Sequence, residues 1–357
     1  MMNPWTNRTM AWLVVAPLTS IACNGDDDDT AIDTDGPTID AGGTATADTA
    51  NLDTDGADVP GGDGGADGGP TEPVYPEDEL EVWELRTGGF APPVHETWYS
   101  CFSFSIELDR LHHIIGFEPV VTHPVIHHYI LSLANQPTEV DPNEPCYEWQ
   151  DRMIWGWAPG IDPMALPEEA GILVGDNPGS TANFILQVHY NNPLLEPVEG
   201  LEEGIDIIAT PTLRPHDAFV WSQGDIANIS IPPGEPDYEH TAHCTESLTQ
   251  GLLDHPIHVF ASFLHAHEIG VAITSEHYRD GDLLSEIASQ IPYDFNMQQF
   301  QPTDVLIRPG DEVVTRCTYD SSERDGVTVG GVASRDEMCI NFMMYYPRIR
   351  SERCGSI

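Results

Sequence analysis

The stretch "IHVFASFLHAHEIG", residues 257–270, joins a short apolar run to two histidines, His265 and His267. Its content of Val, Ile and Phe is typical of a buried β-strand. Because residues two apart on a strand point to the same face, both imidazoles would share one side of a sheet. A buried histidine needs a polar partner. The two rings are therefore either metal ligands or buried polar groups that lower the stability of the core.

Short runs of this type recur from about residue 80 onward, between segments rich in Pro, Gly and Asp. No long stretch has a clear apolar period of 3.6 residues, and the pattern predicts an all-β fold built from sandwiches. The 357 residues are enough for two domains. We place their boundary near "TPTLRPHDA", which gives predicted domains at 80–212 and 213–357. Further runs are "CFSFSIEL", "HHYILSLA", "ANFILQVHYNN", "GIDIIAT", "GVAITSEHY", "DEVVTRCTY" and "MCINFMMYY".

The N-terminus is typical of an exported protein. Arg8 is the only charged side chain in the first 25 residues, and an apolar segment follows at 11–22. That segment is too short for a membrane span, which needs ~20 residues, and it fits a signal-peptide core. Cys23 comes directly after it, as at a bacterial lipoprotein cleavage site, so we expect residues 1–23 to direct export and Cys23 to be lipidated. Asn24 favours the outer membrane, and an ordinary secreted protein is the alternative.

Residues 24–79 differ in composition from the rest of the chain. They are rich in Asp and Gly, contain no basic residue and could not bury a core, so we expect a disordered linker. The whole chain has a net charge of −46, with 59 acidic residues against 13 basic ones, all of them Arg. This charge would repel nucleic acid and anionic membranes. The only membrane contact that we expect is therefore the lipid anchor.

Removing Cys23 from the seven cysteines leaves an even number in an exported chain, which predicts three disulfides. The spacing leaves the pairing open, since six cysteines allow 15 arrangements. Cys101 and Cys146 are the natural pair if the two halves are separate domains. No CxxC spacing is present, which argues against a zinc ribbon.

Two other segments place histidines in or beside apolar runs. "IHHYILSLA" contains His127 and His128, and "ILQVHYNN" contains His189. Any one of them alone is more simply a hydrogen-bonded core or edge histidine. Adjacent residues of a regular strand face opposite ways, so His127 and His128 could share a metal only at a distorted strand end or through different ring nitrogens. A second adjacent pair, at 112–113, we interpret as exposed or loop residues.

Met338 precedes the last long apolar run. A methionine near a strand usually fills a core, but its thioether is also a soft ligand that suits Cu(I). Two histidines and a methionine together would therefore indicate copper. Sequence spacing alone does not bring Met338 to the pair at 265 and 267.

Four of these segments together resemble the copper type II, ascorbate-dependent monooxygenases. "VIHHYIL", "LQVHYNN", "HVFASFLHAHEIG" and the block "GDEVVTRCTYDSSERDGVTVGGVASRDEMCINFMMYYP" occur in the family's order, and the resemblance covers about residues 83–354. It implies two antiparallel, jelly-roll-like β-sandwich domains, each carrying one copper beside a solvent-filled cleft. The implied ligands are His127, His128 and His189 for the first copper, and His265, His267 and Met338 for the second. The implied disulfides are Cys101–Cys146, Cys244–Cys354 and Cys317–Cys339.

The resemblance also implies a division of roles. Dioxygen activation and C–H hydroxylation would occur at the His265, His267 and Met338 site. The other copper would store and deliver an electron, and ascorbate or another reductant would supply both. The expected function is hydroxylation of a small organic molecule, with aromatic compounds and amines as candidate classes. The alternatives are a non-catalytic, extracytoplasmic copper-binding or carrier lipoprotein, and a structural lipoprotein that binds zinc incidentally; oligomeric state stays open.

The departures from the family pattern concern the substrate. In the peptide-amidating branch an Arg, a Tyr and an Asn that anchor a peptide carboxylate occupy the positions of Phe263, Phe342 and Ile340. Their replacement argues against glycine-extended peptides, places the chain closer to the dopamine β-hydroxylase branch and makes an apolar or aromatic substrate plausible. Gln187, two residues before His189, is expected to order water or substrate near the cleft.

Overall fold

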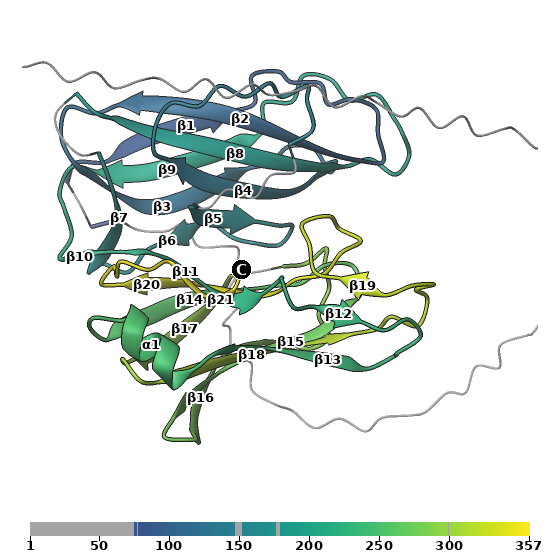
Figure 1. Cartoon of the computed structure of the whole chain (residues 1–357). Helices are drawn as coiled ribbons and strands as arrows, with labels where there is room; N and C mark the ends of the chain where they lie inside the picture. Colours follow the sequence, from purple (N-terminus) through teal and green to yellow (C-terminus); the bar gives the residue numbers. More distant parts are fainter. Residues whose placement is uncertain (1–74, 77, 147–151, 176–178, 299) are drawn as a thin grey trace, which may run out of the picture. The chain divides into compact units, whose positions relative to one another are not determined.

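The computed structural model describes residues 75–76, 78–146, 152–175, 179–298 and 300–357. The predicted signal peptide, Cys23 and nearly all of the predicted linker lie outside these residues. All of the described residues belong to one compact unit. Within the described part of this unit, two sets of β-sheets follow one another along the chain (Figure 1).

The N-terminal half contains two sheets. The first has the order β1-β9-β3-β7-β10, with β6 against β3, and the second has the order β2-β8-β4-β5. The strands of the first are β1 (Glu81–Arg86), β9 (Gly204–Thr210), β3 (His112–Val120), β7 (Ala170–Val174), β10 (His216–Asp217) and β6 (Met164–Ala165). Those of the second are β2 (Thr97–Glu107), β8 (Thr181–Asn191), β4 (Ile126–Ala134) and β5 (Met153–Trp157).

The C-terminal half also contains two main sheets, of order β17-β14-β20-β11-β21 and β13-β18-β15-β16, and a small pair, β12-β19. The first sheet comprises β17 (Phe300–Ile307), β14 (Ile257–His265), β20 (Cys339–Tyr346), β11 (Phe219–Asp225) and β21 (Arg353–Ser356). The second comprises β13 (Tyr238–Cys244), β18 (Glu312–Tyr319), β15 (Gly270–Arg279) and β16 (Asp282–Gln290), and the pair is β12 (Ser230–Ile231) with β19 (Thr328–Val329).

The prediction of an all-β fold is confirmed. The strand pairings are antiparallel, apart from β10 with β7 and β11 with β21. In the N-terminal half the rings of Phe117 and Trp155 stack at 5.3 Å and join the two sheets. In the C-terminal half two disulfides join the facing sheets, Cys244–Cys354 and Cys317–Cys339. With Cys101–Cys146, these are the three pairs that the resemblance implies.

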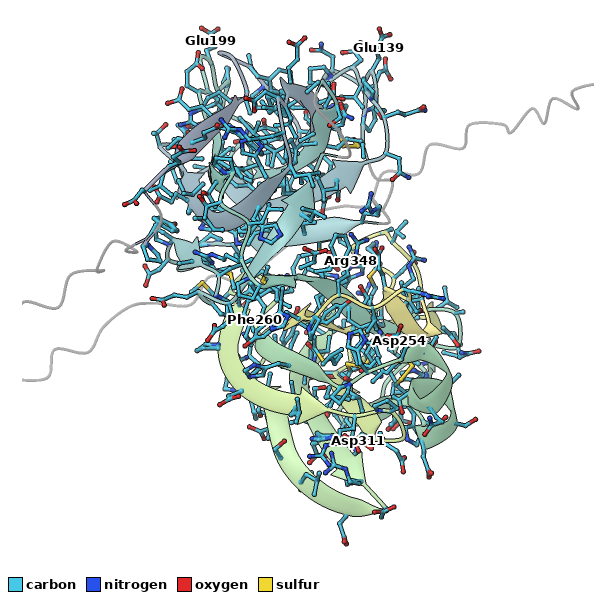
Figure 2. All side chains as sticks on the ribbon, turned by 90° about the vertical axis from the view of Figure 1, so that its left-hand side faces the viewer. Glu139, Glu199, Asp254, Phe260, Asp311 and Arg348 are labelled. Atoms are coloured by element: carbon cyan, nitrogen blue, oxygen red, sulfur yellow. A yellow bond between two sulfur atoms is a disulfide. The ribbon has the colours of Figure 1, made fainter. Side chains whose placement is uncertain are left out.

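A single α-helix, α1 (Glu246–Leu252), lies among the described residues. Thr245 caps it, because its side chain accepts a hydrogen bond from the Leu248 amide. Within the described part of the chain, no helix has the length and apolar character needed to cross a bilayer. Exposed carboxylates such as Glu139, Glu199 and Asp254 lie on the surface (Figure 2).

The interpretation of residues 112–113 as exposed or loop positions is wrong. His112 and His113 begin β3 and are both 1% exposed. The His113 ring accepts a hydrogen bond from the Arg214 amide at Nδ1 (3.0 Å) and, through Nε2–H, donates one to Asp217 (3.0 Å). Each nitrogen thus has a partner, which is how a buried histidine avoids the cost of an unpaired polar group. The partners lie about 100 residues away, so local sequence could not show them.

Burial lowers the pKa of His113, although Asp217 opposes the shift. A histidine with a folded pKa below its unfolded value stabilises the fold above the unfolded pKa of about 6.5 and loses that contribution as pH falls through the folded pKa. We therefore expect His113→Gln to flatten the fall in unfolding free energy between pH 7 and 5, by up to about 1.4 kcal/mol per pH unit. Denaturant titrations of the wild type and the variant between pH 7 and 5 measure this change. Identical slopes of unfolding free energy against pH in the two proteins would contradict a lowered pKa of His113.

Candidate metal centres

Three histidines of the N-terminal half converge on one point. His127 and His128 lie on β4, and His189 lies on the adjacent strand β8. The Nδ1 atom of His128 is 3.2 Å from Nδ1 of His127 and 3.3 Å from Nδ1 of His189. The ligand atoms of all three lie within 4.8 Å of one another, as imidazoles that share one ion do.

A β-bulge explains how two adjacent histidines reach the same site. His128 pairs directly with His189 across the strands, but the register of β4 on β8 shifts between Ile126 and His128. A bulge leaves the extra residue, here His127, unpaired and re-aims its side chain. The distorted strand end is therefore the alternative that the structure adopts, and all three rings approach through the same nitrogen, Nδ1.

The surroundings of this cluster keep its rings neutral and oriented. Burial lowers the pKa of His127, and burial followed by neighbouring histidines lowers the pKa values of His128 and His189 well below the ordinary value. His127 donates its Nε2–H to the side-chain oxygen of Asn296 (2.8 Å), which leaves the Nδ1 lone pair toward the cluster. The ring of Tyr99 stacks on His189 at 4.2 Å. Neutral imidazoles with converging lone pairs fit a metal cation.

The second candidate centre is the pair that ends β14. The rings of His265 and His267 lie 5.1 Å apart at 86°. His265 donates Nδ1–H to Gln298 Oε1 (2.6 Å), and His267 donates Nδ1–H to the Asp336 carbonyl (3.0 Å). These bonds place the proton of each ring on Nδ1 and fix the orientation of both rings. Burial lowers the pKa of His265 to about 3 and that of His267 to about 4, so both rings are neutral at pH 7.

The strand-face explanation of this pair needs correction. β14 ends at His265, and His267 lies in the turn that follows, so a regular strand does not set both side chains. The near-perpendicular rings come from that turn. Met338 immediately precedes β20 and is 1% exposed. Its segment is tied to the turn through Glu337, whose carboxylate accepts hydrogen bonds from the amides of His267 (2.8 Å) and Met338 (3.3 Å).

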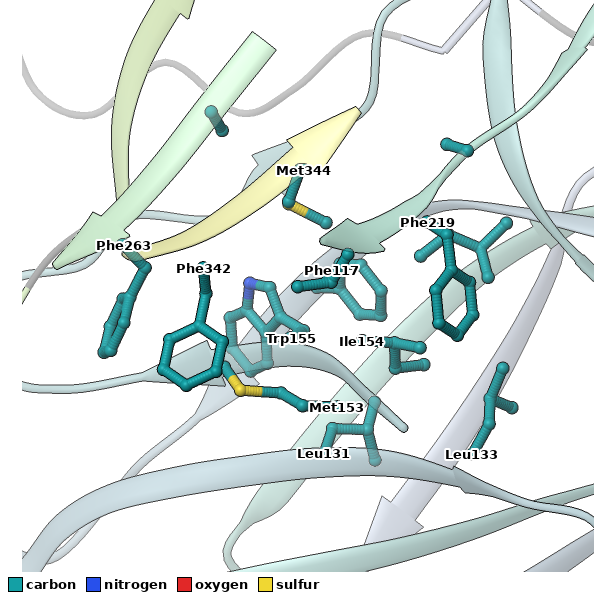
Figure 3. Packing of buried hydrophobic residues seen from close by; sticks show 14 of the residues in the cluster. Phe117, Leu131, Leu133, Met153, Ile154, Trp155, Phe219, Phe263, Phe342 and Met344 are labelled. Carbon is teal, nitrogen blue, oxygen red and sulfur yellow. The ribbon is translucent and has the colours of Figure 1, made fainter. Parts of the chain in front are cut away.

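A small cavity of about 20 Å³ is lined by His128 of the first centre and His265 of the second. Such a volume accommodates about one water molecule. Phe263 and Phe342, which are direct cross-strand partners, line it together with Met153 and Trp157. Figure 3 shows the rings of Phe263 and Phe342 side by side, with Met153 next to Phe342.

Gln187 is buried on β8, and its side chain donates a hydrogen bond to the Cys146 carbonyl (2.8 Å). This contact tethers the segment that carries the first disulfide. The role of Gln187 in ordering water or substrate stays a prediction.

Several residues that orient the histidines had no signal in the sequence. Tyr99, Asn296 and Gln298 lie far along the chain from their partners and in no motif at ligand spacing. Glu337 is an exception, because the sequence "RDEMC" places a carboxylate directly before Met338. A buried carboxylate beside a ligand is a recognisable candidate for a positioning role.

Comparison with known proteins matches both halves of the chain to one family. A family profile described as the copper type II ascorbate-dependent monooxygenase N-terminal domain matches residues 83–197, and the corresponding C-terminal domain profile matches 217–357. Together they cover more than half of the chain. The chain belongs to this family. The first profile spans the three-histidine cluster, and the second spans His265, His267 and Met338.

Named members of the family have similar sequences. The chain is 34% identical to DBH-like monooxygenase protein 1 of Gallus gallus over 304 residues, which covers 78% of this chain and 49% of that protein. It is 33% identical to tyramine beta-hydroxylase of Caenorhabditis briggsae (74% and 48% covered) and 32% identical to dopamine beta-hydroxylase of Homo sapiens (80% and 49% covered). The chain spans about half the length of these relatives.

Proposed function

We propose that this chain is a copper-dependent monooxygenase that hydroxylates a C–H bond of a small organic molecule, with dioxygen and ascorbate or an equivalent reductant. The observation that carries the proposal is the pair of neutral imidazole clusters, one of three rings and one of two, that face a common cavity through His128 and His265. In the balanced reaction, one oxygen atom enters the C–H bond and the other leaves as water. The reductant supplies two electrons and the medium two protons.

The residues present fit two coppers of different character. His127, His128 and His189 would hold one through three imidazoles, a ligand set that supports both oxidation states. His265 and His267 with the Met338 thioether would hold the other, and the soft sulfur favours the reduced ion. Bound copper would supply electron transfer and dioxygen activation. The protein's own contribution is to keep five imidazoles neutral, and to orient three of them through Asn296, Gln298 and the Asp336 carbonyl.

For the substrate, we propose an apolar or aromatic molecule without a carboxylate. Among the described residues that line the small cavity, none is Asp, Glu, Lys or Arg. A larger groove of about 510 Å³, a size that suits small ligands, is lined by apolar residues such as Ile161, Met164 and Phe260, and by Asp162. Phe300 of this groove lies 5.1 Å from Phe263 of the cavity between ring centroids, so the linings of the two spaces meet at this aromatic pair.

Export, with Cys23 lipidated, is part of the same proposal. Three disulfides in the described residues support an oxidising compartment outside the cytoplasm. Release of the protein from membranes by mild detergent, and its absence from them in a Cys23→Ala variant, would test the anchor.

The activity is tested with copper-loaded protein, ascorbate and ¹⁸O₂. We expect one labelled oxygen atom in the product, and faster turnover of neutral phenylalkyl compounds than of glycine-extended peptides. Tight copper binding without labelled product from neutral aromatics, phenolic amines or peptides would instead support the copper carrier.

A further inference from the structure

Glu337 is a fully buried carboxylate at the second candidate centre, with an exposed fraction of 0%. It precedes Met338 and follows the loop after β19. Carboxylates are rarely buried unless they are paired or hydrogen-bonded, because leaving water is costly. The hydrogen bonds that this carboxylate makes therefore indicate its structural role.

Both carboxylate oxygens accept hydrogen bonds from backbone amides. Oε2 accepts from the amides of His267 (2.8 Å) and Met338 (3.3 Å), and Oε1 accepts from the amide of Ile269 (2.9 Å). Two of these amides belong to the turn that carries His267, and the third belongs to the methionine. A carboxylate can make all three contacts because it has acceptors on both oxygens, whereas an amide side chain has only one acceptor oxygen.

Each connected segment is also fixed on its far side. The Tyr293 hydroxyl accepts a hydrogen bond from the Ala266 amide (3.0 Å) and donates one to the Ala266 carbonyl (2.6 Å), which holds the residue between the two histidines. The Tyr319 hydroxyl donates to the Met338 carbonyl (2.7 Å), and Cys339 is bonded to Cys317. The pairing of β14 with β20 and the bond from His267 to the Asp336 carbonyl already bring the two segments together, and Glu337 adds a direct link from the backbone of the turn to the methionine.

We propose that Glu337 is a positioning residue that holds Met338 against the His265–His267 turn, so that the thioether and the two imidazoles keep one ligating arrangement. The inference rests on the proposed function, since it takes Met338 as a copper ligand. It goes beyond that function by assigning the geometry of the site to a side chain that is not itself a ligand.

The test compares Glu337→Gln with Glu268→Gln in the full chain loaded with Cu(I). Glu268 lies in the same turn, between His267 and Ile269, but its side chain is 45% exposed and pairs with Arg324. Copper X-ray absorption reports the sulfur ligand, and chelator competition reports affinity. We expect Glu337→Gln to lose most of the sulfur contribution and to bind copper at this site about 10- to 100-fold more weakly, while Glu268→Gln matches the wild type.

The outcomes separate this inference from the proposed function. A wild-type sulfur contribution that persists in Glu337→Gln, even with a lower unfolding temperature, would make Glu337 merely structural and overturn the inference alone. A wild-type protein without sulfur ligation would overturn the ligand assignment on which both rest. If Glu337→Gln does not fold, Glu337→Asp replaces it: the carboxylate is retained but withdrawn by one methylene, and the same loss of sulfur ligation is expected.

Discussion

Met338→Leu is expected to lower ascorbate-dependent hydroxylation by on the order of 100-fold or more, while the fold is retained. Leucine and methionine have similar volumes, so the exchange at this buried position should cost less than about 1.5 kcal/mol of unfolding free energy. What is lost is the thioether, the one soft donor in the proposed ligand set. The rate of ¹⁸O incorporation and denaturant unfolding of the same preparation measure the two effects.

Met343→Leu is the matched control, because Met343 is equally buried on β20 but is no proposed ligand. It should turn over at the wild-type rate. Equal activity in Met338→Leu would refute the ligand role of the methionine. Equal loss in both variants would show that packing around β20, rather than ligation, limits the rate.

His128→Ala is expected to bind one copper where the wild type binds two, and to lose turnover by on the order of 100-fold. His128 is the central member of its cluster, within 3.3 Å of both other Nδ1 atoms, so its removal leaves two imidazoles that no longer share a third partner. Copper content after dialysis and the rate of labelled product are the measurements. The sulfur ligation at the other centre should be unaffected.

His95→Ala provides the comparison in the same half of the chain, since His95 is exposed and stacks on Trp98. It should retain both coppers and full activity. If His128→Ala also retained two coppers, the three-histidine cluster would not be a copper site. If it lost one copper but kept its rate, that copper would have no part in the reaction.

The overall fold could be predicted because its signal is local and repeated. Runs such as 182–192 and 257–265 have strand length and composition, and turn residues separate them. The errors arise where a local pattern has two structural outcomes. His112 and His113 could occupy a loop or start a buried strand, and the partners that decide for burial, Arg214 and Asp217, are supplied by a distant segment.

At the candidate metal centres, too, local sequence does not decide between two possible structures. The adjacent pair His127 and His128 needed a distorted strand, but only the pairing of β4 with β8 shows that a bulge provides it. Strand geometry predicts that the side chains at 265 and 267 share one face, yet β14 ends at His265. In both places the sequence indicates which residues are candidate ligands. It does not indicate the backbone conformation that orients their side chains.

By itself, the sequence determined the strand-rich fold class, the histidine and methionine candidates and, through the resemblance, the cysteine pairs. These properties depend on the composition, spacing and order of residues, which can be read directly from the sequence. Only the tertiary structure decided which nitrogen each ring presents and what holds the methionine near the turn. Those properties depend on hydrogen bonds between residues tens to more than a hundred positions apart, such as His127 with Asn296 and His267 with Glu337, and no local pattern encodes such contacts.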